Sequence, residues 1–336
     1  MKTVLYIGNY LNNNKTNIST ISTTGALLEN EGYRLYYASS YNNKIVRMMD
    51  MVYTCFKYRK KVDYVLIDTY STWNFYYAFI ISQLCRFLNL SYVPILHGGN
   101  LSRRLQSSPI MSKLLFKNAI YNISPSLYLK QKFSEFGYGN VKYIPNTINI
   151  GKYTFYNRKF DIPKLLWVRS FSEIYNPKVA IEVLKLLKEV YPSSELCMVG
   201  PDSDGSLAKV KTLANKYNVK VKFTGKLKKE QWIELSKDYN TFINTTNFDN
   251  MPVSVIEAMA LGLPVVSTNV GGLPYLIAHK KEGLLVPPNN AYAMSEAVIK
   301  LMKDKNLKEN IVNNARKKVE QFNWEAVKPK WKSLLS

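Results

Sequence analysis

The sequence predicts an α/β protein with two doubly wound, parallel-sheet domains that face each other across a cleft. Three observations support this fold class. Short apolar runs rich in β-branched and aromatic residues alternate with segments of helical periodicity, this alternation occurs twice, and an irregular stretch at 147–163 separates the two series. Ligands of such sheets bind beyond the carboxyl ends of the strands, so strand-end residues are the first candidates for a functional site.

The first series contains six expected strands, at residues 3–8, 34–39, 64–68, 92–97, 119–124 and 141–146. The second series contains six more, at residues 164–169, 195–200, 221–225, 241–246, 264–268 and 283–287. Helical periodicity fills the gaps, as at 177–191 and 290–304. Polar residues interrupt the long apolar stretch 73–90, which predicts a buried helix rather than a membrane span. The polar segment 12–17 is expected to form a loop at the cleft.

The charge is strongly basic. The chain has 46 Lys and Arg against 24 Asp and Glu, a net charge of +22, and residues 1–158 hold 19 of the basic and 6 of the acidic residues. This excess favours polyanionic partners such as nucleic acid, an anionic membrane surface or phosphorylated substrates. No helix-turn-helix, zinc-finger or RNA-recognition pattern accompanies it, which argues against nucleic acid, while a role in solubility alone stays open. The three cysteines show no ligand spacing and the first residues form no signal peptide, so a cytosolic protein is expected.

Residues 47–61 have the pattern of a basic amphipathic helix. Four apolar residues recur at helical spacing and run into a basic cluster, with Met48, Met51, Val52 and Cys55 followed by Lys57, Arg59, Lys60 and Lys61. A helix of this kind can lie on an anionic membrane. The alternative is that the apolar residues face the core of the first domain and the charges are merely solvated.

The segment 249–272 contains the most informative pattern. A short helix is expected directly after a strand, with Asp249 or Asn250 as its cap, Pro252 in its first turn and its end at Gly262. The start of such a helix offers free N–H groups and a positive dipole end to an anion. Ser254 and Glu257 share one face, and a carboxylate in an apolar helix needs a partner from elsewhere in the fold or from a ligand. An anion pocket beside a carboxylate that accepts from a diol fits a phosphate with a ribose.

Other candidate residues follow from their place at strand ends. His97, Arg169, Gly200, Gly225 and Thr246 all lie at the carboxyl ends of expected strands. The pair Asp202 and Asp204 has the Asp-x-Asp spacing of a metal site, but turn-forming residues surround it, so we interpret it as a turn. With two histidines and no cluster of ligands, no metal site is expected.

The run from Asp249 to Gly272 resembles the nucleotide-sugar signature of the retaining family 4 glycosyltransferases, which have the GT-B fold. Further segments agree with this family in order and spacing, at 97–99, 122–126, 141–149, 165–171, 196–200, 221–227, 283–288 and in the final helix. The resemblance covers most of the chain. It implies a Rossmann-like acceptor domain at 1–158, a Rossmann-like nucleotide-sugar domain at 159–321, and a helix at 322–336 that packs back on the first domain.

The resemblance also implies an activity. It is the metal-independent, retaining transfer of a sugar from a nucleotide-diphosphate donor to a glycan or lipid-linked acceptor, without a cofactor and with the leaving phosphate oxygen as base. Synthesis of a bacterial surface polysaccharide, such as lipopolysaccharide or capsule, is the expected setting, in the cytoplasm or at the inner face of the cell membrane. The sequence shows no general-base dyad that contradicts this mechanism. The alternatives are another GT-B enzyme, such as an epimerase or a phosphorylase, and a module that only binds polyanions.

The family's site residues carry over to matching positions. By this resemblance, Glu257 is expected to bind the donor ribose and Arg169 the diphosphate. Asp249 is expected to lie near the sugar in place of the usual glutamate, and His97 near sugar and acceptor. The family lysine about five residues after Arg169 is absent, and Lys178 is the expected substitute. The catalytic set is therefore His97, Arg169 and Asp249. The donor-binding set comprises Gly8, Arg169, Lys178, Gly200, Gly225, Lys226, Thr246, Asn250, Met251, Pro252, Val253, Ser254 and Glu257.

Overall fold

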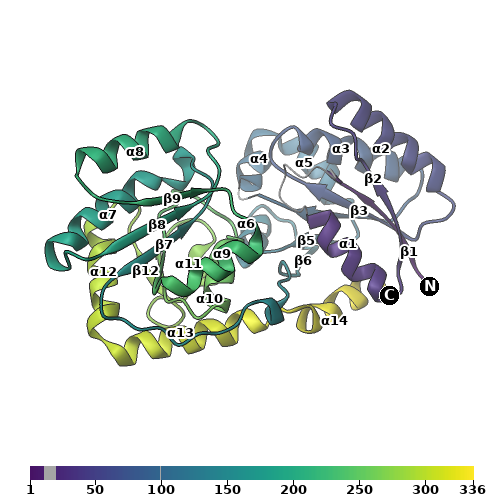
Figure 1. Ribbon diagram of the computed structural model, residues 1–336. Coiled ribbons are helices and arrows are strands. Elements are labelled where there is room, and N and C mark those ends of the chain that lie inside the picture. Colours follow the sequence, from purple (N-terminus) through teal and green to yellow (C-terminus); the bar gives the residue numbers. More distant parts are fainter. Residues whose placement is uncertain (11–19, 99) are drawn as a thin grey trace. The chain divides into compact units, whose positions relative to one another are not determined.

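The structure is a computed structural model that describes residues 1–10, 20–98 and 100–336. The loop expected at 12–17 lies outside the described residues, as does Gly99 of the 97–99 segment. The chain divides into two compact units, and each is built on one parallel sheet of six strands within the described residues (Figure 1). Unit 1 comprises Met1–Thr147 and Trp324–Ser336, and unit 2 comprises Ile148–Asn323. The two predicted parallel sheets are confirmed.

The sheet of unit 1 has the strand order β2-β1-β3-β4-β5-β6. Its strands are β1 (Thr3–Ile7), β2 (Arg34–Ala38), β3 (Tyr64–Thr69), β4 (Tyr92–Leu96), β5 (Asn122–Ser124) and β6 (Val141–Tyr143). Along β1, Leu5 and Ile7 enter the core on one face, while Val4 and Tyr6 enter the core on the other. Both faces are therefore buried, which explains why these strands read as continuous apolar runs.

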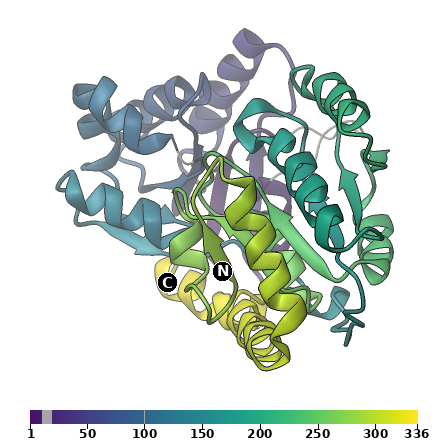
Figure 2. The ribbon, with the colours of Figure 1, turned by 90° about the vertical axis from the view of Figure 1, so that its left-hand side faces the viewer.

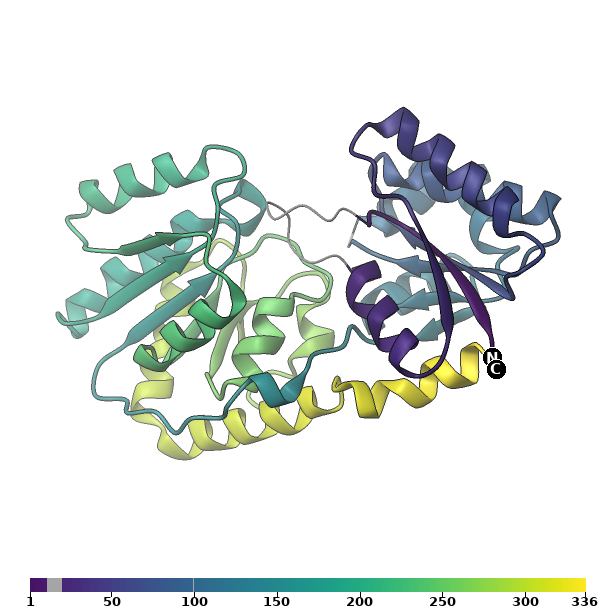
Figure 3. The same ribbon diagram turned by 45° about the vertical axis from the view of Figure 1, so that its right-hand side comes forward.

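Helices cover both faces of this sheet. On one face lie α2 (Lys44–Tyr58), α3 (Asn74–Phe87), α4 (Leu101–Ser107), α5 (Pro109–Phe116) and α6 (Leu127–Glu135). On the other lie α1 (Thr20–Asn30) and the final helix α14 (Trp324–Leu334), which buries Val327 and Trp331 against Val4 and Leu66 (Figure 3). The last helix of the chain is thus part of the core of unit 1.

The sheet of unit 2 has the strand order β12-β11-β10-β7-β8-β9. Its strands are β7 (Lys164–Val168), β8 (Glu195–Val199), β9 (Lys222–Gly225), β10 (Thr241–Asn244), β11 (Val265–Thr268) and β12 (Leu284–Val286). One face carries α7 (Pro177–Val190), α8 (Ser206–Lys216) and α12 (Ala291–Lys303), with α7 and α12 side by side (Figure 2). The other face carries α9 (Lys229–Leu235), α10 (Val253–Ala260), α11 (Leu273–Leu276) and α13 (Lys305–Glu320). Short 3-10 turns occur at η1 (Ile150–Lys152), η2 (Glu173–Tyr175) and η3 (Ser236–Asp238).

The boundary between the units falls after Thr147 and not at residue 158. The reason is that the segment after Thr147 already packs on unit 2. Ile148 pairs with Asn323 in an isolated bridge, and Tyr153 is buried in the core beneath α10. Among the helices of the described residues, none combines the length and apolar character that crossing a membrane requires.

Candidate active site

Arg169 stands at the carboxyl end of β7, the position predicted for a ligand-binding residue. The backbone N–H of Arg169 donates to the Val199 carbonyl at 3.0 Å. The backbone of Gly200 lies directly against the carbonyl of Arg169. A Cβ at residue 200 would collide with that carbonyl oxygen, so glycine is required for this close approach. Gly200 N–H in turn donates to the Gly225 carbonyl at 2.9 Å. Gly200 and Gly225 therefore serve the backbone geometry that positions Arg169.

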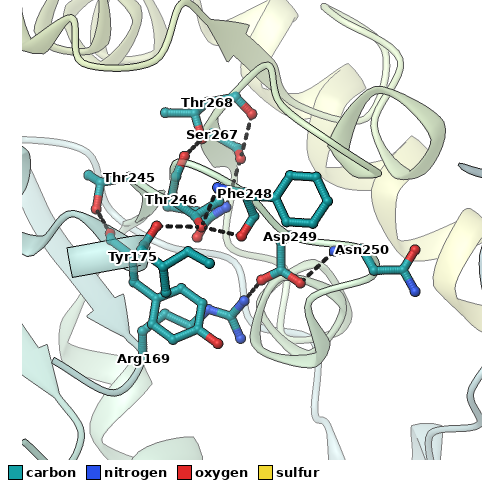
Figure 4. A network of polar contacts seen from close by, with 11 residues as sticks. Arg169, Tyr175, Thr245, Thr246, Phe248, Asp249, Asn250, Ser267 and Thr268 are labelled. Carbon is teal, nitrogen blue, oxygen red and sulfur yellow. Dashed lines mark hydrogen bonds and ion pairs between the residues drawn. The ribbon is translucent and has the colours of Figure 1, made fainter. Parts of the chain in front are cut away.

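The guanidinium of Arg169 forms an ion pair with Asp249 (Figure 4). It also lies over the ring of Tyr175, 4.3 Å from the ring centroid. Burial lowers the pKa of Arg169, and the neighbouring Tyr175 opposes this shift. Two of the three predicted catalytic residues thus contact each other directly. Tyr175, in the region where the family lysine is missing, contributes an aromatic ring in place of a cation.

The loops that carry these groups are tied to the end of β10. The Thr246 hydroxyl lies 2.9 Å from the Phe248 carbonyl and 3.2 Å from the Ile174 carbonyl, and the Thr268 hydroxyl donates to the Thr246 carbonyl at 2.6 Å (Figure 4). Thr246 was expected to bind the donor. Its side chain is fully buried, and its hydroxyl contacts the loops that carry Ile174 and Phe248.

The α10 helix begins differently from the sequence expectation. Pro252 occupies the N-cap position rather than the first turn, and Asp249 pairs with Arg169 instead of capping the helix. Gly272 packs against the Asn250 carbonyl so closely that a Cβ would not fit, and its N–H donates to the Asp249 carbonyl at 2.8 Å. Val255 N–H and Ile256 N–H donate to the Pro252 carbonyl at 3.1 and 3.3 Å, so the first N–H groups of α10, those of Val253 and Ser254, are the ones that precede the helical hydrogen-bond pattern, as at any helix start. The start of α10 therefore remains suited to an anion.

Ser254 adds an unsatisfied hydroxyl to this helix start. Its Oγ is buried and has no hydrogen-bond partner among the described residues. A buried hydroxyl without a partner costs free energy, so a functional explanation is needed. A phosphate oxygen at the start of α10 would supply the acceptor.

Glu257 has two partners from distant parts of unit 2. Its side chain is 5% exposed, and its Oε1 accepts a hydrogen bond from Tyr153 Oη at 2.7 Å and an ion-pair contact from Lys229 Nζ. Burial, with the Glu257 carboxylate as the next cause, holds the pKa of Tyr153 well above its usual value. Glu257 thus has a partner from elsewhere in the fold, the distant basic residue Lys229. Lys229 is half-exposed, with 46% of its side chain accessible, so it can leave the carboxylate at little cost.

The remaining predicted donor-binding residues are more scattered. Lys178, in the first turn of α7, and Lys226, after β9, are exposed. Val253 is exposed at the start of α10, whereas Asn250 and Met251 are buried in the loop before it. No contact brings Lys178 to Arg169 within the described residues. Lys229, which sequence reasoning missed, is the lysine that reaches the site.

A second polar cluster lies at the carboxyl edge of the sheet of unit 1. His97 follows β4, and its Nε2 lies 2.8 Å from Asp68 Oδ1. Tyr6 Oη donates to the same oxygen at 3.1 Å, and a Cβ on Gly8 would come within 2.6 Å of Asp68 Oδ2. Gly8 therefore makes room for the Asp68 carboxylate. Tyr70 stacks on the His97 ring at 4.9 Å, and burial raises its pKa well above the usual value.

The His97–Asp68 pair corrects one sequence conclusion. No general-base dyad was recognised in the sequence, because the two residues are 29 positions apart. Asp68 is nevertheless the last residue of the predicted strand 64–68, so the strand-end rule that selected His97 applies to it as well. A carboxylate bonded to one ring nitrogen fixes the orientation of the imidazole.

The carboxylates of Asp202 and Asp204 are used locally. Asp202 accepts from Gly205 N–H at 3.0 Å, and Asp204 accepts from Glu173 N–H at 2.9 Å and Ser206 N–H at 3.1 Å. Bonding to the Ser206 hydroxyl is the largest of the causes that lower the pKa of Asp204 to about 2. The two carboxylates therefore organise the turn before α8. Across residues 1–10, 20–98 and 100–336, no group of three or more His, Cys, Asp or Glu side chains is arranged to hold a metal ion.

Comparison with solved structures agrees with the fold. Sucrose-phosphate synthase from Thermosynechococcus elongatus superimposes with a TM-score of 0.83 at 19% identity, over 99% of this chain and 98% of that protein. HepE of Anabaena, in complex with UDP, superimposes with a TM-score of 0.79 at 15% identity, over 100% and 99% of the two chains. The two doubly wound sheets are those of the GT-B glycosyltransferase fold.

Sequence comparison finds a family model that matches much of unit 2. Residues 155–318 match the model of the family Glycosyl transferases group 1. WcaL of Salmonella typhimurium, a glycosyltransferase assigned to colanic acid biosynthesis, is 40% identical over 91 residues. This alignment spans 26% of the chain and 22% of WcaL, so it covers less than a quarter of that relative.

Proposed function

We propose that the protein is a retaining, metal-independent glycosyltransferase of family 4 that uses a nucleoside-diphosphate sugar and no cofactor. One observation carries the proposal: Arg169 pairs with Asp249 in the loop before α10, the unpartnered Ser254 hydroxyl lies in the first turn of that helix, and the buried Glu257 carboxylate follows one turn later. A diphosphate next to a ribose requires such a combination, a cation and hydrogen-bond donors for the phosphates and a carboxylate for the ribose hydroxyls. The UDP found in HepE and the family of residues 155–318 support the same class of donor.

The contacts of Arg169, Ser254 and Glu257 suggest how the donor would bind. The diphosphate takes the place of Asp249 on Arg169, and the first-turn N–H groups of α10 and the Ser254 hydroxyl bind its oxygens. Asp249 is then free to accept hydrogen bonds from the sugar. The ribose hydroxyls donate to Glu257 and displace Lys229 into solvent. As the sugar leaves, Arg169 and the helix start stabilise the negative charge that develops on the diphosphate.

His97 is the proposed contact to the sugar and acceptor in unit 1. With Nε2 held by Asp68, its Nδ1 is the ring nitrogen that remains for a substrate hydroxyl. In the retaining reaction, His97 binds a hydroxyl, and the leaving phosphate oxygen takes the proton of the acceptor.

The same pair favours a second candidate function. An imidazole oriented by a buried carboxylate is suited to remove the proton from an acceptor hydroxyl. Direct attack by that oxygen on the anomeric carbon would invert the configuration of the transferred sugar. Inverting transfer is therefore the alternative that the His97–Asp68 pair supports.

Two observations bear on the class of acceptor, the similarity to WcaL and the basic charge of the chain. The relation to WcaL supports a role in surface-polysaccharide synthesis. The net charge of +22 supports an acceptor that is phosphorylated or held at an anionic membrane, on the cytoplasmic side of the cell.

Thermal unfolding with UDP, GDP and ADP tests the donor site. At about a hundredfold excess over its dissociation constant, a ligand stabilises the folded protein by about 2.7 kcal/mol. Stabilisation by one nucleotide and not by inorganic phosphate is expected, and equal effects of all polyanions would leave only a polyanion-binding module. Mass spectrometry of glycan acceptors with the matching nucleotide sugar then distinguishes a transferase from an epimerase or a phosphorylase. Proton NMR of the new anomeric centre decides between retention and inversion.

A further inference from the structure

Exposed apolar side chains are concentrated in unit 1. Of the 21 large hydrophobic side chains that are exposed among the described residues, 16 belong to unit 1 and 5 to unit 2. Single exposed apolar residues are normal on a protein surface, but a contiguous group marks an interaction site. The distribution therefore directs attention to the surface of unit 1.

The α2 helix carries an apolar stripe on its outer side. Ile45, Met49, Tyr53 and Phe56 recur at intervals of three or four residues, and all are exposed, with Ile45 72% accessible. The apolar residues singled out in the sequence lie on the opposite side, where Met51 and Cys55 are buried and Met48 and Val52 pack against the same core. The alternative that these four residues face the core of the first domain is thus correct. The stripe that remains exposed is a different one.

The stripe continues onto the neighbouring helices. At α3 the exposed residues are Trp73, Tyr76, Ile80 and Phe87, the last 81% accessible, and at α5 they are Ile110 and Leu114. The α3 helix packs against both α2 and α5, and all three cover the same face of the sheet (Figures 1 and 3). We call this surface the α2–α3–α5 face, defined by the ten residues named for the three helices.

Basic side chains border the α2–α3–α5 face. Lys44 lies over the ring of Trp73 at 5.4 Å and Lys57 over the ring of Tyr53 at 5.9 Å. Arg104 of α4 lies over the ring of Tyr76 at 5.4 Å. Further cations follow the ends of α2 and α5, namely Arg59, Lys60, Lys61 and Lys117. Within α2, α3, α4 and α5 the single acidic residue is Asp50.

We propose that the α2–α3–α5 face docks on an anionic lipid bilayer, with the apolar stripe in the interface and the cations at the headgroups. Charge complementarity selects this occupant. A second copy of a chain with a net charge of +22 would bring one basic border against another, which is repulsive. Nucleic acid would satisfy the cations but not Ile45, Met49 and Phe87, whose burial requires an apolar phase. An anionic bilayer satisfies both.

The face adjoins the proposed acceptor site of unit 1. In a parallel sheet with crossover helices, each helix begins at the carboxyl edge, so Lys44 and Trp73 mark the end of the face nearest the edge that carries His97 and Asp68. Docking would bring this edge toward lipid-linked molecules. The inference goes beyond the proposed function, because docking on lipid needs neither a sugar donor nor transfer.

Sedimentation of the full chain with vesicles tests the docking. Vesicles of phosphatidylglycerol and phosphatidylcholine in equal parts are expected to bind the protein, pure phosphatidylcholine to bind it far less, and added salt to weaken binding. The double variant Ile45→Ser/Met49→Ser should lower the partition coefficient about tenfold. Its matched control, Val190→Ser/Tyr292→Ser, replaces two exposed apolar residues of unit 2 and should bind as the wild type does.

A second pair of variants tests whether binding depends on where the basic residues lie or only on the net charge. Lys57→Glu/Lys60→Glu/Lys61→Glu should abolish binding to the anionic vesicles. Lys216→Glu/Lys220→Glu/Lys281→Glu has the same net charge, but its changes lie in unit 2, and it should retain most of the binding. Of the five tryptophans, all of them described, Trp73 alone is exposed, so brominated lipids should quench its fluorescence.

Several outcomes would overturn the proposal. They are equal recovery on neutral and anionic vesicles, no recovery on either, or equal losses in the unit 1 variants and their unit 2 controls. Unquenched Trp73 on sedimenting vesicles would show that another surface binds. A dimer in sedimentation equilibrium that Ile45→Ser/Met49→Ser dissociates would assign the face to a second copy instead. None of these results depends on donor or acceptor, so the glycosyltransferase proposal would stand.

Discussion

At the residue scale, Glu257 shows how a buried carboxylate can serve both fold and ligand. Its partners are a tyrosine hydroxyl, which is buried with it, and a lysine whose side chain is 46% exposed. Removing the charge leaves Tyr153 with an acceptor and releases Lys229 to water. The carboxylate is therefore held in place but not locked in a fully buried ion pair.

Glu257→Gln should weaken nucleotide binding much more than it destabilises the fold. Donor affinity is expected to fall by about 1.5–3 kcal/mol, because a charge-assisted hydrogen bond to ribose is lost. The free energy of unfolding should change by at most about 1 kcal/mol, because Lys229 is largely solvated. Calorimetric titration and thermal unfolding measure the two effects. The matched control is Glu282→Gln, a buried carboxylate beside the partly exposed Lys318, which should leave affinity unchanged.

The opposite pattern would refute the ribose-binding role. A large drop in melting temperature with unchanged affinity in the folded fraction would make Glu257 a purely structural partner of Lys229.

Ser254→Ala should leave the fold as stable as before or slightly more so, because the hydroxyl has no partner among the described residues. Affinity for the nucleoside diphosphate should fall by about 1 kcal/mol through the loss of one hydrogen bond. Ser267→Ala is the control, because Ser267 Oγ accepts from Asn244 Nδ2 at 2.9 Å. That variant should lose stability and keep its affinity. If the two variants behave alike, Ser254 has no role at the donor site.

At the element scale, α14 is held on unit 1 by charge as well as by its core contacts. Glu31, beyond the end of α1, pairs with Lys332 at 2.8 Å and Lys328 at 3.2 Å, and Trp324 Nε1 donates to it at 3.1 Å. The hydrogen bond to Lys332 is the largest cause that lowers the pKa of Glu31 from 4.5 to about 2. The carboxylate is thus stabilised in its charged form in the folded state.

Acid should loosen α14 in a predictable window. Because the pKa of Glu31 is lower in the folded state, its contribution is complete above pH 4.5 and is lost as the pH falls toward 2. Hydrogen exchange of residues 324–334 should therefore be faster in Glu31→Gln than in the wild type above pH 4.5, and the two should converge near pH 2. A difference that persists at the acid end would mean that the carboxylate charge is not responsible.

At the scale of the whole molecule, metal independence is a prediction about the complete site. The leaving diphosphate is assigned to Arg169 and the start of α10, so no divalent ion is needed to neutralise it. Transfer assayed with excess EDTA should proceed at the rate measured without it. Loss of activity that Mn²⁺ or Mg²⁺ restores would contradict the prediction. The control is a nucleotide titration in EDTA, which shows whether binding or transfer is affected.

The sequence by itself determined the architecture and the edges that carry the site. All twelve strands lie where the apolar runs predicted them, although β5 begins at Asn122 and not at residue 119. Strand and helix periods are local properties, and parallel strands bring their carboxyl ends to one edge whatever the details of packing. Arg169 and His97 could therefore be found without coordinates.

Only the tertiary structure decided which side chains meet. Glu257 is 104 residues from Tyr153 and 28 from Lys229, and no local period links such positions. The exposed apolar stripe on the outer face of α2 was not predicted from the sequence, for a related reason. The helix is apolar on both sides, so its sequence shows that a face is buried but not which one. Ion pairs and burial depend on the elements packed against a residue, and those contacts exist only once the sheet and its helices have assembled.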